Sequence, residues 1–318
     1  MRLGQVASIT DTGRKRRRNE DAFVVQPPLF AVADGMGGAR AGEIASRLAT
    51  EALRDDERAS GGEDHLATLI QAANQRVYER SSADSAAFGM GTTITVALVE
   101  NELVSIGHVG DSRAYLVRAG KLEQLTEDHS LVAELLRSGK LSPEEAETHP
   151  QRSVITRALG TDPDVDADMF SVAARPGDIF FLCSDGLTSM VADEEIQRTV
   201  EANRRDLDRA AQELVQLANR GGGEDNITVV FFEIAEDSVE ETAELPVPAA
   251  ATHTEPEADE DDEDTLDELD AIPTLESAGA DGGAEAEPER GRLARLAIVI
   301  GVLLVVALAA LAVWAYLS

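Results

Sequence analysis

Eight short runs of β-forming residues limit what this chain can fold into. They cover residues 6–9, 22–25, 29–33, 92–99, 103–109, 114–118, 179–183 and 227–234. Turn-length connections separate several of them, such as Glu100 with Asn101 and Ala119 with Gly120. Connections this short join antiparallel strands, because a parallel pair needs a crossover of a dozen residues or more. The runs therefore predict antiparallel hairpins.

Helical spacing occurs between these runs. One predicted helix ends at Gly221, Gly222 and Gly223, and its apolar face consists of Leu207, Ala210, Ala211, Leu214, Leu217 and Ala218. Residues 40–54 and 64–80 show the same amphipathic pattern. Strands in blocks with helices between them are typical of an α+β fold, in which the helices pack outside antiparallel sheets.

The composition changes abruptly after residue 235. Residues 236–289 contain 21 Asp and Glu but no Lys or Arg, and are rich in Ala, Pro and Gly. Such a segment buries too little apolar surface to offset the entropy of ordering it. We therefore expect a globular domain over residues 1–235 and a disordered acidic linker over residues 236–289. A solvated spacer is the plainer interpretation of the linker, and an acidic docking arm is the alternative.

Residues 290–318 are different again. The 22 residues 296–317 carry no charge, and at about 1.5 Å per residue a helix of that length spans a hydrocarbon core of about 30 Å. Arg290, Arg292 and Arg295 precede the run, and Trp314 and Tyr316 lie near its end. The pattern predicts a single-pass transmembrane helix with residues 1–295 in the cytoplasm. A buried core helix is the alternative. The N-terminus lacks the apolar stretch of a secretory signal.

Charge and cysteine content exclude some classes of function. The net charge is −32, of which residues 236–289 contribute −21 and the three arginines after them +3, which leaves −14 for residues 1–235. A domain this acidic is a poor candidate for nucleic-acid binding, which depends on Lys and Arg. The single cysteine, Cys183, excludes an internal disulfide and suits a reducing compartment.

Acidic residues stand where apolar strands end. Asp34 is followed by Gly35, Asp111 and Asp185 each follow an apolar run, and Asp225 precedes one. Each alone is typical of a turn. Together they predict a site for Mg²⁺ or Mn²⁺, which bind clusters of carboxylate and carbonyl oxygens. Zinc is disfavoured, because the five histidines show no paired ligand spacing.

Nine short motifs occur in the order in which they stand in the protein phosphatase 2C family. They are Gly13 with Arg16, Asn19, Glu20 and Asp21; Asp34-Gly35-Met36-Gly37-Gly38; Gly91-Thr92-Thr93; Gly110-Asp111-Ser112-Arg113; Asp128-His129-Ser130-Leu131; His149-Pro150; Arg157-Ala158-Leu159-Gly160; Ser184-Asp185-Gly186-Leu187; and Asp225-Asn226. Over residues 3–234 the chain resembles the bacterial members, the metal-dependent serine/threonine phosphatases.

The resemblance implies a four-layer αββα sandwich of two antiparallel sheets flanked by helices. It also implies two Mn²⁺ or Mg²⁺ ions in a cleft between the sheets. Asp34 would bridge the ions and Gly35 would offer its carbonyl oxygen to one of them, while Asp185 and Asp225 complete the shell of the other. Glu20 would act through a water, and Asp21 is a possible member of the second shell.

Two positions depart from the family pattern. Asp111 resembles a residue that helps to hold a third metal ion in bacterial relatives, but Ser189 stands where a second Asp is usual, so a third ion is left open. Met36 stands where many eukaryotic members have a histidine proposed as general acid, which leaves the proton donor for the leaving alkoxide unassigned.

The remaining implications concern the substrate. Arg16 would grip the substrate phosphate with its planar guanidinium; a generic basic patch over residues 14–18 is the alternative. Residues 127–160 resemble a mobile flap beside the site, packed by Leu131, Leu135, Leu136 and Leu141, with an ordinary helical insertion as the alternative.

The chain is thus expected to hydrolyse phosphoserine and phosphothreonine directly, without a phosphoenzyme, through water activated by two metal ions. It would reverse bacterial serine/threonine kinase signalling, with phosphorylated proteins, including kinases, as partners. One alternative is a catalytically inactive phosphoprotein-binding scaffold of the same fold. Another is a different two-metal hydrolase, such as a nuclease, which the domain charge disfavours.

Overall fold

The computed structural model describes residues 2–37, 41–56, 60–85, 87–147 and 149–236. The expected transmembrane segment 296–317 and all of the expected linker except residue 236 lie outside these ranges. Among the helices within these ranges, none combines the length and the apolar character that crossing a membrane requires.

Two antiparallel sheets form the centre of the domain. The first has the strand order β1 (Arg2–Asp11), β11 (Ile227–Ala235), β10 (Ile179–Cys183), β7 (Arg113–Arg118), β8 (Lys121–Gln124). The second has the order β2 (Asp21–Gln26), β3 (Leu29–Met36), β5 (Ile94–Glu100), β6 (Leu103–Val109), β9 (Asp168–Ala173), with β4 (Gly91–Thr92) paired to the end of β3. Each pairing is antiparallel, as the short connections predicted.

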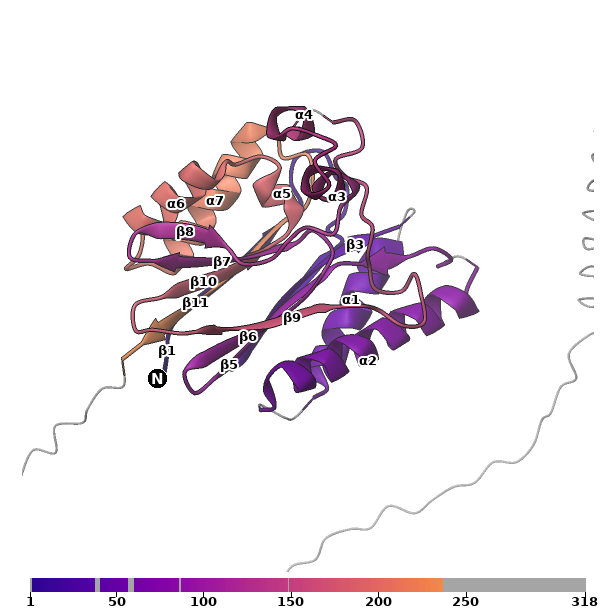
Figure 1. The fold of residues 1–318 in the computed structure, drawn as a ribbon, viewed down its shortest axis with the longest axis horizontal. Helices are drawn as coiled ribbons and strands as arrows, with labels where there is room; N and C mark the ends of the chain where they lie inside the picture. Colours follow the sequence, from indigo (N-terminus) through magenta and orange to yellow (C-terminus); the bar gives the residue numbers. More distant parts are fainter. Residues whose placement is uncertain (1, 38–40, 57–59, 86, 148, 237–318) are drawn as a thin grey trace, which may run out of the picture. The chain divides into compact units, whose positions relative to one another are not determined.

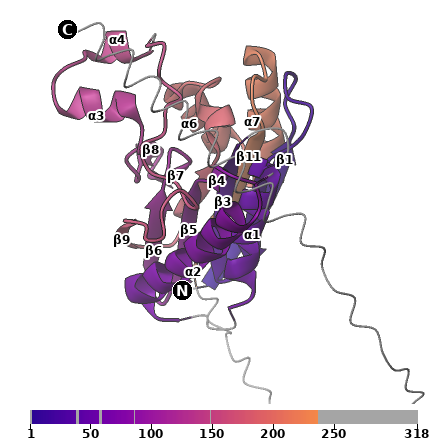
Figure 2. The same cartoon turned by 90° about the vertical axis from the view of Figure 1, so that its right-hand side faces the viewer.

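Helices cover the outer face of each sheet, which gives four layers (Figure 1). On the second sheet lie α1 (Ala41–Arg54) and α2 (Gly62–Ala83), side by side in Figure 2. On the first sheet lie α5 (Asp185–Thr188), α6 (Asp193–Ala202) and α7 (Leu207–Gly221). Two short helices, α3 (Leu131–Arg137) and α4 (Pro143–Glu147), stand at one end of the sandwich. The predicted α+β class and layer order are confirmed.

The central strands are apolar on both faces because both faces are covered. In β10, Phe180 and Leu182 pack toward the other sheet, whereas Phe181 and Cys183 pack toward the helices. The rings of Phe30 and Phe232 stack across the two sheets with centroids 4.4 Å apart. Side chains alternate along a strand, so a continuous apolar run can fill two separate cores.

The structure differs from the predicted elements in two ways: one predicted run is interrupted, and three elements were not predicted. The run 92–99 is interrupted at Thr93, whose backbone N–H donates to the carbonyl oxygen of Asp34 and whose Oγ1 accepts the Asp34 N–H, both at 2.9 Å. No element was predicted for β8, β9 or α6. Strands β8 and β9 lie at the sheet edges and have no buried side chain, so their hydrophobic periodicity is weak. Helix α6 buries Ile196, Thr199 and Val200 at helical spacing, which is a signal that the sequence analysis missed.

A buried histidine makes the fold sensitive to mild acid. His108 is fully buried, with Nδ1 3.0 Å from Thr95 Oγ1 and Nε2 3.1 Å from the carbonyl oxygen of Glu127. Burial, followed by the neighbouring His129, lowers the pKa of His108 to about 4. The unfolded chain binds this proton near pH 6.5, so the free energy of unfolding decreases as the pH falls from about 6.5 toward 4.

We expect His108→Asn to reduce that pH dependence. In urea unfolding, the wild type should lose about 1 kcal/mol more than the variant between pH 7.5 and pH 5.5. Equal losses would contradict the assignment of the acid sensitivity to His108.

Candidate metal and phosphate site

Acidic side chains from distant parts of the chain line one pocket of about 190 Å³ at the end of the sandwich where β3 and β10 finish. The predicted site residues Arg16, Glu20, Asp34, Gly35, Asp111, Asp185 and Asp225 all contribute to its wall, together with Met36, Gly37, Ser153 and Ile155. The structure therefore brings together seven of the eight residues predicted for the site.

Asp21, the eighth, lies behind the pocket. It is paired in register with Asp34 across β2 and β3. Its Oδ2 accepts hydrogen bonds from Ser184 Oγ at 2.8 Å and Thr228 Oγ1 at 2.6 Å, both from the segments that carry the first sheet. Asp21 thus connects the two sheets directly beneath the pocket.

Glycine is required at position 35 because the backbones of β3 and α1 pack closely there. A Cβ at this position would lie 2.1 Å from the carbonyl oxygen of Gly42 in α1. Any side chain would push α1 away from the end of β3. Because α1 packs beside the Asp34 segment, glycine at this position keeps the pocket wall intact.

Arg16 reaches the pocket on a loop that is held to the start of β11. Its Nη2 donates to Asp225 Oδ2 at 2.6 Å. Asn226 holds the loop: its side-chain amide donates to the carbonyl oxygens of Thr12 and Arg18, each at 2.9 Å, and its Oδ1 accepts the backbone N–H of Glu20 at 2.7 Å. One buried amide therefore positions both Arg16 and Glu20.

The carboxylates of the site destabilise one another when no cation is present. Burial, followed by the charges of Asp21, Asp185 and Asp111, raises the pKa of Asp34 well above its ordinary value. Burial, followed by Asp185, raises the pKa of Asp111 to about 8. The same causes, burial and a neighbouring carboxylate, raise the pKa of Asp185. A site that concentrates uncompensated negative charge favours a bound cation.

The residues fit a hard divalent cation. Oδ1 of Asp21 and Oδ1 of Asp185 are buried without a hydrogen-bond partner, which is costly unless something else binds them. The donors lining the pocket are oxygens, the ligands that Mg²⁺ and Mn²⁺ prefer. Among the described residues, no three acidic, histidine or cysteine side chains are gathered closely enough to hold a metal ion as they stand.

A second cavity, of about 410 Å³, adjoins the first, since Asp111, Ser153 and Asp185 line both. Helices α3 and α4 of the predicted flap border it, and Val132, rather than the predicted leucines, is the buried apolar residue of α3. Ser189 and Asp111 both line this cavity. A third ion would therefore meet a hydroxyl at this position instead of a carboxylate.

Sequence reasoning assigned no role to several residues of the site. Asn226 occurs in a recognised motif, but nothing local shows that its amide would reach Thr12, 214 residues earlier. Ser153 and Ile155 come from the flap segment and gave no chemical signal. Thr93 Oγ1 and Ser112 Oγ lie 2.7 Å apart beneath the segments of Asp34 and Asp111.

Asn226→Ala should impair both folding and activity. The change removes the donor to the part-buried carbonyl oxygens of Thr12 and Arg18 and frees Arg16 and Glu20. We therefore expect a loss of roughly 1–3 kcal/mol in stability and about 10-fold in kcat/KM. Urea unfolding and steady-state kinetics well below the melting temperature would measure both.

Asn74→Ala is the matched control for this substitution. Asn74 is also fully buried, donates to the carbonyl oxygens of Asp162 and Pro163, and accepts the N–H of Gly160. The Asn74→Ala variant should lose about as much stability as Asn226→Ala but should have a smaller decrease in kcat/KM. Equal kinetic losses would show that Asn226 acts only through stability.

Comparison with known proteins supports this arrangement. The family model "Protein phosphatase 2C" matches residues 13–224. The chain is 42% identical over 236 residues to the serine/threonine phosphatase stp of Listeria monocytogenes serotype 4b, covering 70% of this chain and 93% of that protein. It is 41% identical over 233 residues to the serine/threonine protein phosphatase PstP of Mycobacterium tuberculosis, covering 72% of this chain and 45% of PstP.

Solved structures agree. The crystal structure of Mycobacterium tuberculosis PstP/Ppp has a TM-score of 0.70 and 39% identity, covering 74% of this chain and all of that one. A structure of the PstP catalytic domain in complex with two manganese ions has a TM-score of 0.68 and 37% identity, covering 74% and 99%. With a family model matched over most of the described domain and relatives at this identity, the chain belongs to the protein phosphatase 2C family.

Proposed function

We propose that this chain hydrolyses phosphoserine and phosphothreonine in proteins, using two Mn²⁺ or Mg²⁺ ions held in the 190 Å³ pocket. The observation that carries the proposal is the composition of the pocket wall. Carboxylates from five separate segments line it, and a single arginine, Arg16, faces them. That combination provides ligands for cations together with a binding group for the substrate phosphate.

Each residue has a distinct role in the proposal. Asp34, Asp185, Asp225 and the Gly35 carbonyl would hold the ions, and Glu20 would act through a water. Asp21 orients the segments behind them through Ser184 and Thr228. When bound, the ions would lower the pKa of a water molecule and stabilise the negative charge of the phosphoryl group in the transition state. A third ion at Asp111 remains a separate proposal.

Arg16 is positioned by Asp225, since its Nη2 donates to Asp225 Oδ2 at 2.6 Å. A planar guanidinium held at the pocket would bind two oxygens of the substrate phosphate. Met36 lines the pocket and cannot transfer a proton, so the chain offers no side chain at this position to protonate the leaving alkoxide.

The decisive experiment is phosphate release from phosphothreonine and phosphotyrosine peptides with Mn²⁺, with Mg²⁺ and with chelator. We expect hydrolysis of the phosphothreonine peptide that depends on the metal and is lost in Asp185→Asn. Activity that survives both the chelator and the substitution would refute the proposal. Metal-independent binding of phosphopeptides without hydrolysis would favour the inactive scaffold instead.

We also propose that residues 296–317 anchor the chain to a membrane with the catalytic domain in the cytoplasm, and that membrane-bound serine/threonine kinases are among its substrates. The uncharged run and the three arginines before it support this orientation. A flexible chain of 54 residues, the length of segment 236–289, reaches about 40 Å. Deleting residues 290–318 tests both parts. No loss of the membrane fraction, or no change in kinase dephosphorylation, would count against the proposal.

A further inference from the structure

Five consecutive cationic residues, 14–18, form an exposed loop between β1 and β2; we call it the basic loop. Arg16 pairs with Asp225, and Arg18 Nη1 lies 3.7 Å from Glu43 Oε2. Among the residues that the structure describes, the side chains of Arg14, Lys15 and Arg17 have no hydrogen-bond or ionic partner. Three positive charges therefore remain uncompensated beside the residue that would bind phosphate.

The backbone of the basic loop is fixed. The N–H groups of Arg14 and Lys15 both donate to the carbonyl oxygen of Gly223, at 2.8 and 3.1 Å, and the carbonyl oxygen of Arg18 accepts from Asn226. Gly13 adopts φ +75°, and a Cβ at this position would lie 2.1 Å from the carbonyl oxygen of Asp225. A partner would therefore meet cations whose backbone is already placed, which reduces the entropy lost on binding.

The charge of the loop is opposite to that of its surroundings. Residues 1–235 carry a net charge of −14, which would repel an acidic peptide at most of the surface. At the basic loop the sign reverses. Arg220 at the end of α7 lines the same surface hollow as Arg14, and Asp11 is the one acidic residue among the described residues that line it. Local complementarity of this kind gives specificity and faster association.

We infer that the basic loop selects phosphoproteins with acidic or additional phosphorylated residues close to the phosphoresidue that is hydrolysed. The inference rests on the proposed function, because Arg16 must hold the scissile phosphate. An extended peptide advances about 3.3 Å per residue, so anions about two to four residues away would face Lys15, Arg17 or Arg14. Segment 236–289 of the same chain, with 21 acidic residues, is a competing occupant that the test must separate.

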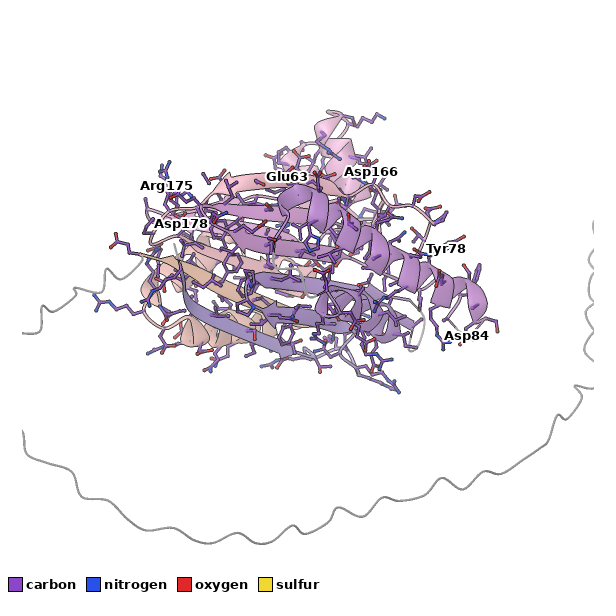
Figure 3. All side chains as sticks on the ribbon, turned by 90° about the horizontal axis from the view of Figure 1, so that it is seen from below. Glu63, Tyr78, Asp84, Asp166, Arg175 and Asp178 are labelled. Carbon is purple, nitrogen blue, oxygen red and sulfur yellow. The ribbon has the colours of Figure 1, made fainter. Side chains whose placement is uncertain are left out.

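The experiment compares three phosphothreonine peptides on the full chain with Mn²⁺: one with alanine flanks, one with glutamate flanks and one with a phosphoserine three residues away. The test variant is Arg14→Gln/Lys15→Gln/Arg17→Gln. The matched control, Lys121→Gln/Arg175→Gln/Arg205→Gln, removes the same charge from the first residue of β8 and from the segments before β10 and α7. Figure 3 shows Arg175 beside Asp178, at the opposite end of the domain from Asp84, which follows the end of α2.

At low salt we expect the wild type to prefer the two acidic peptides by about 10-fold in kcat/KM. The test variant should lose most of this preference while its kcat/KM for the alanine peptide stays within about 2-fold, and the control should keep the preference. Added salt should reduce the preference in the wild type.

Each failure has its own meaning. No preference in the wild type, or the same preference in the test variant, overturns the inference. If the wild type does not hydrolyse the alanine peptide in the presence of the metal, the proposed function is overturned instead. If neutralising the acidic residues among 259–264 raises activity on all three peptides, and the test variant is insensitive to that change, the loop serves the chain's own acidic segment and the inference is wrong.

Discussion

Replacing Asp34 with asparagine is expected to lower kcat/KM for a phosphothreonine peptide on the order of 10³-fold. Asp34 lines the pocket, and the charges of Asp21, Asp185, Asp111 and Asp225 all raise the pKa of its carboxyl group. Asparagine keeps the shape of the side chain but offers a neutral oxygen, which is a weaker ligand for the ions that Asp34 would hold. Steady-state kinetics over a range of Mn²⁺ concentrations would measure the loss, which saturating metal should not restore.

The same substitution should have the opposite effect on metal-free stability. The folded-state pKa of Asp34 is raised, so its carboxyl group destabilises the fold progressively as the pH rises above the unfolded value near 3.9. Asparagine avoids that cost. In chelator at pH 7.5 we expect the variant to be more stable by roughly 2 kcal/mol in its free energy of unfolding, which corresponds to a melting temperature about 6 °C higher than that of the wild type. Saturating Mn²⁺ should raise the melting temperature of the wild type more than that of the variant.

Asp178→Asn is the matched control for Asp34→Asn. Asp178 is also buried, but it accepts hydrogen bonds from Arg118 and the N–H of Arg175 at the other end of the domain (Figure 3). Its replacement should lower stability with and without metal and leave kcat/KM nearly unchanged. If Asp34→Asn also destabilised the metal-free protein, Asp34 would be a structural residue and the proposed centre would be wrong.

Arg16→Ala should lower kcat/KM by about 10²-fold, and Arg16→Lys by about 10-fold. Alanine removes the group that would bind the phosphate, whereas lysine keeps the charge but loses the planar, two-pronged geometry. The loss should be smaller for a substrate whose phosphate is held mainly by the cations. Parallel measurements of kcat and KM for the two variants would show whether Arg16→Ala loses more activity than Arg16→Lys.

The ion pair between Arg16 and Asp225 adds a second readout. Removing Arg16 leaves the Asp225 carboxylate without its neutralising partner at 2.6 Å. Arg16→Ala should therefore bind Mn²⁺ at least as tightly as the wild type in isothermal titration calorimetry. Weaker metal binding would mean that Arg16 supports the metal centre itself rather than the substrate.

Local sequence patterns predicted the central elements well because those elements are determined by burial and turn geometry. The two-residue turn at Ala119 and Gly120 is present, with both residues at positive φ, as a tight hairpin requires. Helix α7 ends at Gly221, within the predicted glycine run. Cys183 is buried in the first sheet, as its apolar neighbours indicated.

Patterns did not reveal the elements and contacts that depend on distant partners. Strand β9 is recognisable only through its pairing with β6. The role of Asn226 depends on carbonyl groups more than 200 residues earlier in the chain. Neither contact leaves a local signature, because hydrogen bonds to a backbone group can be made by a partner anywhere in the sequence.

The sequence by itself determined that carboxylates follow apolar strands, and its motif order identified the family that places two metal ions among them. Only the tertiary structure decided that Asp34 from one sheet faces Asp185 and Asp225 beside the other, with Arg16 paired to Asp225. The physical reason is that the two sheets are held face to face by Phe30, Phe232 and their neighbours. Packing between sheets is non-local, and it sets the distances on which the chemistry depends.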